Sequence, residues 1–373
     1  MLHLTPELID ALNRLLLALV NQRQARVTVP AYAQQPGYWF GGGNILVDQD
    51  EVLWLSGRYR NAGDSRQGLA AGERGLECAI FRSDDRGRTF RKWAAWSKAD
   101  MSRPGRRIIS IEGTALHRRS DGRIELFVSS EKDLTYPADC EMFQKPGTGV
   151  WTIDRIVADS VEKLAPRSIG AVVENHDKPL YLHAKDPVVF DGPGDATHML
   201  FCTHPYTWAS ANTSWATQAA GGQEFKLLRD EIVSRGAAWD VAATRITCRL
   251  PIPRKGIFSN LPPCSIYFYD GAECMREHDE SDRAFRRPRG YSCEELGGAF
   301  FGWDSEFPSM VRLSDSGPLF VSPWGTGCSR YVDAITLDDG ILATWQQSQM
   351  DLSQALVSHF LPMSEVESFL SGR

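Results

Sequence analysis

A short apolar strand that ends in polar or aromatic residues recurs along this chain. Its five copies lie at residues 53–58, 125–131, 199–204, 266–270 and 319–324. Spacings of roughly 45 to 75 residues suit a four-stranded unit with variable loops. Radial repetition of such units protects the edges of many antiparallel strands. The repeat therefore predicts an all-β, five-bladed β-propeller.

A second strand precedes most copies of this repeat, at residues 43–46, 112–116, 186–190 and 307–311. The fourth unit fits poorly, with residues 240–244 or 260–264 as its candidates. In a propeller the first strand of each blade lines the central channel. Equivalent positions of different blades should therefore meet in space although they are distant in sequence.

Both ends of the chain carry helical patterns. Thr5 is a candidate N-cap and Pro6 suits a first helical position, ahead of an apolar stripe that extends to residue 22. Residues 352–370 show a weaker pattern that Pro362 interrupts. We expect short helices at both ends.

These patterns predict three segments. They are an N-terminal helical extension (1–30), the propeller (31–345) and a C-terminal helical segment (346–373). Few basic residues line the polar face of the first helix, which disfavours a membrane anchor. Its apolar stripe should pack against the domain or a partner subunit, so this helix is the candidate contact of a homo-oligomer.

Composition excludes several classes of protein. A chain of 373 residues with 42% hydrophobic content and a net charge of −6 can bury a large core and is a poor partner for nucleic acid. It lacks an apolar run of about 18 residues and the pattern of a secretory signal, so no membrane association is expected. Eight cysteines without a CxxC pair indicate buried thiols in a reducing compartment. These features predict a cytoplasmic protein.

Two carboxylates occupy equivalent places in the predicted blades. Glu112 and Asp186 fall near the same ends of the inner strands of units two and three. Glycoside cleavage uses such a pair: one carboxyl group protonates the leaving oxygen, and the other activates water or stabilises charge at the anomeric carbon. We therefore expect both to be catalytic.

Three segments resemble known propeller families. Residues 111–130 resemble the general-acid strand and hairpin of the five-bladed propeller glycosidases, the arabinanase, xylosidase and invertase-like families, and residues 184–192 are similar to their Asp-Pro strand. Residues 83–90 resemble the Asp box of sialidases, a structural turn. The resemblance spans about residues 38–340. It implies that Glu112 is the general acid, with Asp186 orienting it or stabilising the transition state.

One departure puts the base in doubt. An Asp opens the first blade of those glycosidases as base or nucleophile, whereas residues 41–44 here are Gly-Gly-Gly-Asn. Either the base has moved to another blade, with Asp64, Glu131 or Glu306 as candidates, or the reaction is not simple hydrolysis. We include Glu306 among the predicted catalytic residues.

Other residues are candidates for binding substrate. Arg58 and Arg60 alternate at a strand end and suit a carboxylate or phosphate, with ion pairs to Asp64 or Asp84 as the alternative. Basic groups flank the Asp-Pro strand, and two aromatic residues follow their strands directly and could stack on sugar faces. The predicted substrate-binding residues are Arg58, Arg60, Glu131, His183, Lys185, His204, Tyr206 and Trp324.

The sequence thus predicts a carbohydrate-active enzyme, an exo-acting glycoside hydrolase on a small sugar or oligosaccharide. Two alternatives stay open: a sialidase-, lyase- or phosphorylase-type enzyme on an acidic sugar, and a noncatalytic sugar-binding propeller. We predict no catalytic metal and no cofactor, because no compact Cys/His cluster is present. The Asp-rich turn at residues 191–195 leaves a structural calcium ion open.

Overall fold

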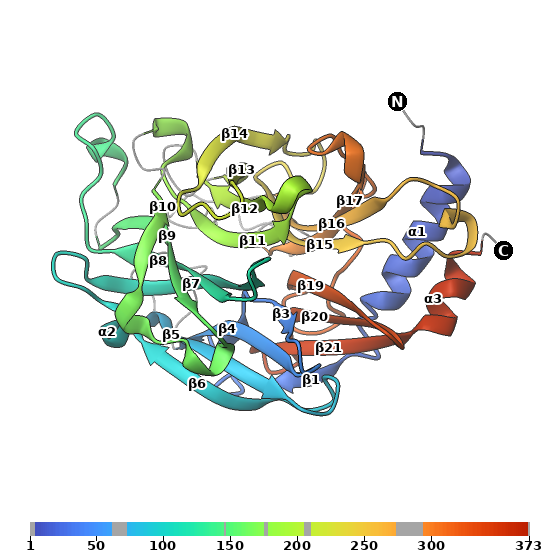
Figure 1. The fold of residues 1–373 in the computed structure, drawn as a ribbon, viewed down its shortest axis with the longest axis horizontal. Coiled ribbons are helices and arrows are strands. Elements are labelled where there is room, and N and C mark those ends of the chain that lie inside the picture. The colour runs from blue at the N-terminus through green and yellow to red at the C-terminus, as the bar shows by residue number, and fades with distance from the viewer. Residues whose placement is uncertain are drawn as a thin grey trace, which may run out of the picture.

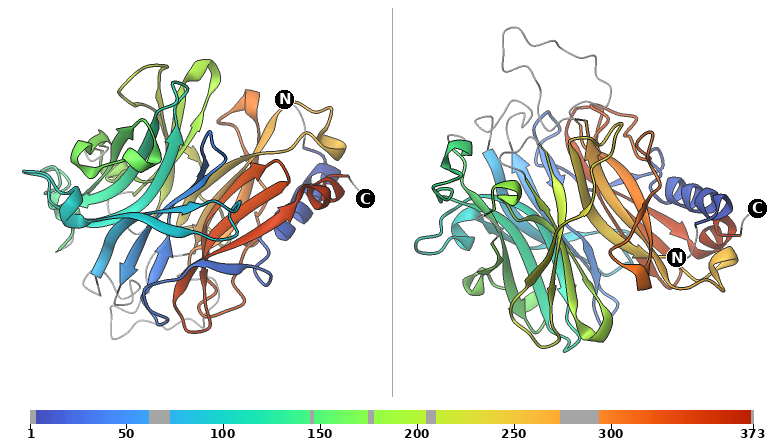
Figure 2. Two further views of the ribbon diagram at one scale, coloured as in Figure 1. Left: turned by 60° about the horizontal axis from the view of Figure 1, so that its bottom comes forward. Right: turned by 90° about the horizontal axis from the view of Figure 1, so that it is seen from above.

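A computed structural model describes residues 4–61, 73–144, 147–174, 178–204, 210–273 and 294–371. The strands form a five-bladed β-propeller, with helices α1 (Pro6–Leu19) and α3 (Met363–Phe369) side by side on its outside (Figures 1 and 2). A short helix α2 (Lys98–Met101) lies between the first two blades. The predicted fold class is confirmed.

Each blade is an antiparallel sheet of four strands. Blade I consists of β3 (Ile45–Val47), β4 (Leu53–Asn61), β5 (Glu73–Ser83) and β6 (Arg91–Ser97). Blade II consists of β7 (Ile108–Arg118), β8 (Ile124–Lys132), β9 (Val150–Ala158) and β10 (Gly170–Val173). Blade III consists of β11 (Lys185–Asp191), β12 (Thr197–Thr203), β13 (Asn212–Gln218) and β14 (Lys226–Val233). Blade IV consists of β15 (Ala243–Pro251), β16 (Cys264–Ala272), β17 (Leu296–Trp303) and β18 (Val311–Arg312). Blade V consists of β19 (Ser329–Leu337), β20 (Gly340–Ser348), β21 (Gln354–Pro362) and β1 (Arg26–Val29).

The two ends of the chain close the propeller together. Strand β1 pairs antiparallel with β21, so an N-terminal strand completes the blade that the C-terminal strands build. The short strand β2 (Trp39–Gly41) then lies between β21 and β4 and joins blades V and I into one nine-stranded sheet. This pairing covers edges that would otherwise be free for another chain.

The fifth repeat was placed wrongly from sequence. Residues 319–324 do not form the second strand of a blade; Leu319 and Phe320 instead donate backbone hydrogen bonds to Gly297, next to blade IV. Residues 307–311 end at β18, the outer strand of blade IV. The inner strand of blade IV is β15, which overlaps the candidate 240–244 and not 260–264.

The C-terminal helical segment is wrong over most of its length. Residues 340–362 form β20 and β21, and only α3 is helical. Strand β21 is covered by β20 on one edge and by β1 on the other. Because it is central in its blade, tertiary pairing outweighs the weak helical pattern of its sequence.

The apolar stripe of α1 is buried by its own chain. Thr5 caps the helix, since its side chain accepts a hydrogen bond from the Leu8 N–H. Leu12, Leu15, Leu16 and Leu19 are fully buried in a cluster with apolar residues of blades IV and V. The first of the two expected packing modes is therefore observed, and the homo-oligomer stays a prediction.

The six cysteines in the described ranges are buried and free of disulfides. None of the helices in those ranges has the length and apolar character needed to cross a bilayer.

The inner strands bend at the same end of the propeller. In β7, β11 and β19 the register with the next strand shifts near the end where the inner strand begins, and in β15 it shifts in the middle of the strand, between Ile246 and Cys248. Asp186 and Tyr331 lie at two of these bulges with φ of 51° and 53°. Bulges re-aim side chains and are common next to active sites. The beginnings of the inner strands therefore form the candidate functional end of the propeller.

Candidate active site

Charged side chains from every blade converge at this end of the propeller. We call the group the axial cluster. Its members are Arg58, Arg60, Arg74, Glu112, Glu131, Lys185, Asp186, Arg245, Asp270, Glu295, Arg330 and Tyr331. Glu112 and Asp186 come from neighbouring inner strands, and the N–H of Gly113, the residue after Glu112, donates to Asp186 Oδ1 at 3.1 Å.

Asp186 is held by three other blades. Its Oδ1 accepts hydrogen bonds from Gly113 and from the Tyr331 hydroxyl at 3.4 Å, and its Oδ2 pairs with Arg245 Nη1 at 3.1 Å. A positive φ is costly for a residue with a side chain, and such strain clusters at functional sites. Asp186 is therefore a fixed carboxylate at the head of the axial cavity.

Arg245 connects blades III, IV and V. Besides Asp186, its guanidinium pairs with Asp270 at 2.7 Å and with Glu295 at 3.0 Å, and it lies 4.3 Å from the centroid of the Tyr331 ring. Glu295 also pairs with Arg330. Burial raises the pKa of Asp270, against the opposing effect of Arg245. This web orders the blade junctions around Asp186.

Glu112 is surrounded by cations. Its Oε2 lies 3.2 Å from Arg58 Nε, and its Oε1 accepts a hydrogen bond from Ser110 Oγ at 2.8 Å. Burial acts to raise the pKa of Glu112, but Lys185, Arg58 and Arg60 outweigh it and lower the pKa to about 2. Glu112 is therefore ionised at neutral pH, which does not suit the general-acid role that the resemblance implies.

Glu131 has the opposite character. It lies at the end of β8, where Arg74 Nη1 is 2.8 Å from its Oε2 and the Gly149 N–H donates to its Oε1 at 2.7 Å. Burial raises the pKa of Glu131 to about 7 despite these two partners, and the charge of Glu112 raises it further. Neighbouring carboxyl groups with separated pKa values are typical of acid and base pairs.

The basic residues beside Asp186 are mostly buried. His183 Nε2 lies 2.8 Å from the Tyr136 hydroxyl, and His204 Nδ1 lies 2.7 Å from the carbonyl oxygen of Ser210. Burial and the charge of Lys185 lower the pKa of His204 to about 3. Lys185 Nζ lies 5.1 Å from the centroid of the Trp151 ring. His204 is therefore neutral at physiological pH.

One predicted catalytic residue, Glu306, lies outside the axial cluster. At the cluster end of blade IV, Asp270 of β16 pairs with Gly297 of β17. At the opposite end, Cys264 pairs with Trp303. Glu306 follows Trp303 in the chain, so it lies at the end opposite the cluster. Its predicted catalytic role is therefore wrong.

Two aromatic candidates and one carboxylate cannot be placed in the cluster. Trp324 lies in the loop before β19, which is fixed by a hydrogen bond from Thr326 to Ser348 Oγ, and its stacking role stays a prediction. Tyr206 and Asp64 lie outside the described residues.

The alternative role predicted for Arg58 and Arg60 is an ion pair with Asp64 or Asp84, and the structure describes Asp84. Asp84 pairs with Arg82 and Arg91 on the outer hairpin of blade I, so it is not their partner. In the adjacent turn Asp85 accepts the Thr89 N–H at 2.8 Å. That contact is the kind expected of an Asp box, whose kinship with sialidases stays a prediction.

Several cluster residues were missed from sequence. They are Arg74, Arg245, Asp270, Glu295, Arg330 and Tyr331. Arg245 directly follows the candidate inner strand 240–244, so an alignment extended by one residue finds it. Tyr331 and Arg330 were missed because the fifth blade was placed too early in the chain.

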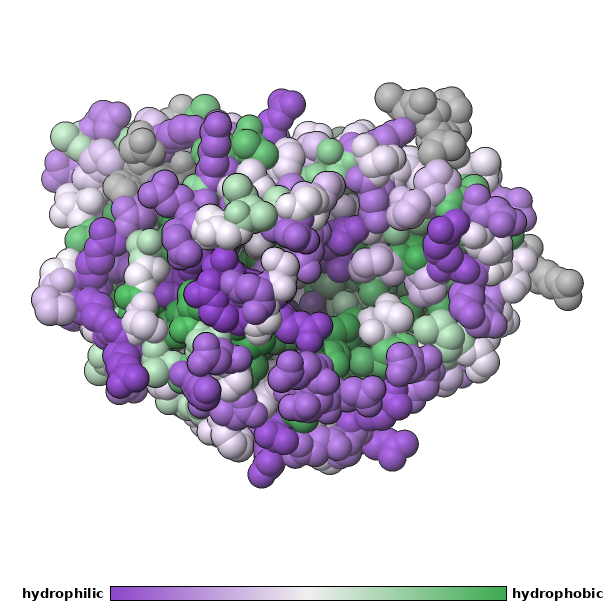
Figure 3. Space-filling view, viewed as in Figure 1, coloured by the Kyte–Doolittle hydropathy of each residue, from purple (hydrophilic) through white to green (hydrophobic). Residues whose placement is uncertain are grey.

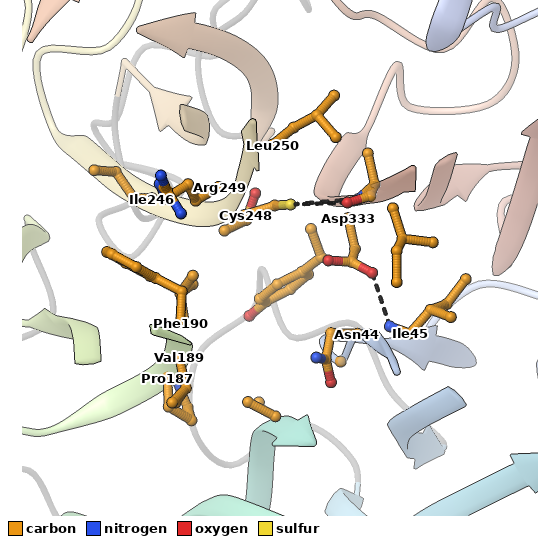
Figure 4. Close-up of a pocket in the computed structure, with 18 of the residues that line it drawn as sticks. Asn44, Ile45, Pro187, Val189, Phe190, Ile246, Cys248, Arg249, Leu250 and Asp333 are labelled. Atoms are coloured by element: carbon orange, nitrogen blue, oxygen red, sulfur yellow. Dashed lines mark hydrogen bonds between the residues drawn. The ribbon is translucent and has the colours of Figure 1, made fainter. Parts of the chain in front are cut away.

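A cavity of about 510 Å³ runs along the propeller axis below Asp186 and Tyr331. Inner-strand residues such as Val189, Phe190 and Leu250 give it largely apolar walls (Figure 4). Figure 3 shows apolar residues around a central hollow with a hydrophilic rim. Asp333 is buried in the wall, where its Oδ2 accepts the Ile45 N–H at 2.8 Å, and burial raises its pKa to about 6.

Within the described ranges, no group of three or more His, Cys, Asp or Glu side chains is arranged to hold a metal ion. Asp191 Oδ1, in the Asp-rich turn at residues 191–195, lies 3.0 Å from His117 Nε2. A structural calcium ion stays a prediction.

Comparisons with known proteins agree with this fold. No family model and no curated protein matches the sequence. Among solved structures, a glycosyl hydrolase from Bacteroides ovatus is similar over 91% of both chains (11% identity, TM-score 0.54). An α-L-arabinofuranosidase from Lactobacillus brevis is similar over 89% of this chain and 92% of its own (10% identity, TM-score 0.54). A β-xylosidase is similar over 91% and 95% (11% identity, TM-score 0.52). The chain therefore has the propeller fold of glycoside hydrolases.

Proposed function

We propose that this protein is a glycoside hydrolase that acts on a small sugar or oligosaccharide in the exo mode. The observation that carries the proposal is the pair Glu112 and Glu131, which lie in one cluster with pKa values of about 2 and about 7. Such a pair supplies one ionised and one protonated carboxyl group near neutral pH. Asp186 adds a third, fixed carboxylate beside the axial cavity.

The protonation states favour a reversal of the roles inferred from sequence. Glu131 donates its proton to the glycosidic oxygen as the bond to the anomeric carbon breaks. Glu112 stabilises the positive charge that develops at that carbon, and water completes the hydrolysis. Asp186, held by Arg245 and Tyr331, fixes the ring hydroxyls or the developing charge.

The structural neighbours support this class of reaction. Proteins of the same fold are named as a glycosyl hydrolase, an arabinofuranosidase and a β-xylosidase. All act on glycosidic bonds by name, so a sugar is the substrate class that the fold favours. The buried free cysteines suit the cytoplasmic location that we propose for the enzyme.

A noncatalytic sugar-binding propeller is the second candidate. Gly42 stands near the place where the resembling families have an Asp, and its carbonyl oxygen accepts the Thr114 N–H at 2.7 Å. The first blade therefore brings backbone and not a carboxylate to this point. Tight binding of sugars without turnover would select this candidate.

The test is product release from a panel of aryl glycosides. We expect turnover by the wild type and at least a 100-fold loss in Glu112→Gln, since Glu112 stabilises charge in the transition state. Glu306→Gln is the matched control, because Glu306 lies at the opposite end of the blade. Loss of less than tenfold in Glu112→Gln, with the fold intact, would contradict the proposal.

A further inference from the structure

Arg60 is a buried cation without a carboxylate partner among the described residues. Its side chain is only 8% exposed, and its Nε has no hydrogen-bond partner there. Its guanidinium lies 4.9 Å from the centroid of the Trp39 ring, the residue that faces it across the β2–β4 pair. A buried guanidinium that contacts a ring and has no ion-pair partner at short range leaves hydrogen-bonding capacity unused.

Arg58 has spare capacity as well. It is 2% exposed, and its Nε forms an ion pair with Glu112. Its Nη1 nevertheless has no hydrogen-bond partner among the described atoms. Both arginines project from the same face of β4, two residues apart. Each guanidinium presents a planar fork of N–H donors that matches a carboxylate or phosphate oxyanion, so two arginines on one strand face suit an anionic ligand.

The surroundings of this pair are electropositive. Arg60 interacts with the charges of Arg58, Arg74 and Arg330, while Glu112 is the carboxylate that opposes them. Glu295 neutralises Arg330 by direct pairing, and Glu131, with its pKa of about 7, is only partly ionised at neutral pH. Burial together with these cations lowers the pKa of Arg60 to about 10, so it still carries its charge at neutral pH. The positive charge of Arg60 is therefore not neutralised by an ion pair with a described carboxylate.

We propose that Arg58 and Arg60 bind the carboxylate of an acidic sugar, so that the substrate is a uronic or related sugar acid. An anion there would occupy the free guanidinium N–H groups and neutralise the excess charge next to Glu112. Arg60 is the specificity residue, because Arg58 is already engaged by Glu112. Trp39, only 6% exposed, fixes the plane of the Arg60 guanidinium.

This inference rests on the proposed function for its sugar, but it can be tested without turnover. Calorimetric titration would compare sugars in acid and neutral pairs, glucuronate with glucose and galacturonate with galactose, together with inorganic phosphate. We expect at least one acid to bind the wild type at least tenfold more tightly than its neutral partner. Arg60→Gln should remove that preference, and Arg60→Lys should retain part of it because the charge remains.

Arg86→Gln is the matched control, since it removes an exposed arginine that pairs with Asp339 at the opposite end of the propeller. It should keep the full preference. Equal affinity for acid and neutral members in the wild type would overturn the inference even if Arg60→Gln failed to fold. A preference that survives in folded Arg60→Gln, or phosphate binding tighter than that of every sugar acid, would also overturn it.

The two proposals fail separately. Turnover of neutral aryl glycosides with no preference for acids would remove the acidic substrate and leave the hydrolase. An acid preference that Arg60→Gln abolishes, without turnover of any aryl glycoside or uronide, would leave the anion site and remove the hydrolase.

Discussion

The pH dependence of kcat/KM should follow the ionisation of Glu131. The proposed mechanism needs Glu131 protonated, with a pKa of about 7, and Glu112 ionised, with a pKa of about 2. We therefore expect kcat/KM to be level in mildly acidic solution and to fall about tenfold per pH unit above the pKa of Glu131. If Glu112 were the acid instead, only about one molecule in 10⁵ would be active at pH 7.

The assay is hydrolysis of an aryl glycoside with a poor leaving group, at pH values where circular dichroism shows an intact fold. Glu131→Gln should lower kcat/KM by about 10²- to 10⁴-fold and abolish the alkaline fall. Its loss should be much smaller with a highly acidic leaving group, which needs no proton. An alkaline fall of unchanged midpoint in Glu131→Gln would refute the assignment.

Three further predictions concern the residues around this pair. Gly113→Ala should lower kcat by about 100-fold without unfolding the protein. The reason is that the new Cβ would lie 2.4 Å from Asp186 Oδ1 and misplace that carboxylate. An unchanged kcat would contradict this prediction. Arg245→Met should lower the free energy of unfolding in urea by about 3–5 kcal/mol, since it leaves buried carboxylates unpaired; a loss under about 1 kcal/mol would mean that the web is not stabilising. Asp191 and Glu125 raise the pKa of His117 against the effect of burial. Protonated His117 therefore stabilises the fold, and this contribution is complete below about pH 6.5, the pKa in the unfolded state. It is lost as the pH rises through the folded-state pKa. His117→Asn should therefore lose stability at low pH and show a weaker pH dependence in urea unfolding; an unaltered pH dependence would contradict this.

Local sequence was sufficient where a strand carries its own signal. The strands that contain Glu112 and Asp186 have apolar runs and turn residues at both ends, and the two strands meet as expected, since Gly113 donates to Asp186. The repeat also predicted the five blades, because four of its copies are true second strands.

Sequence reasoning failed where pairing decides the structure. Strand β21 becomes a strand through β20 and β1, and β1 is more than 300 residues away in the chain. The incorrect position of the fifth blade left Tyr331, one of the partners of Asp186, out of the predicted site. The roles of Glu112 and Glu131 could not be assigned from residue types, because burial and the neighbouring cations of other blades set their pKa values.

The most direct test of the account is a crystal structure of the Glu131→Gln variant with an intact glycoside bound. We predict that the sugar ring lies in the axial cluster, with its anomeric carbon next to Glu112. The glycosidic oxygen should lie within about 3.2 Å of the substituted side chain at position 131. A sugar bound without contact to Glu112 or to position 131, for example at the Phe190 end of the axial cavity, would contradict the account.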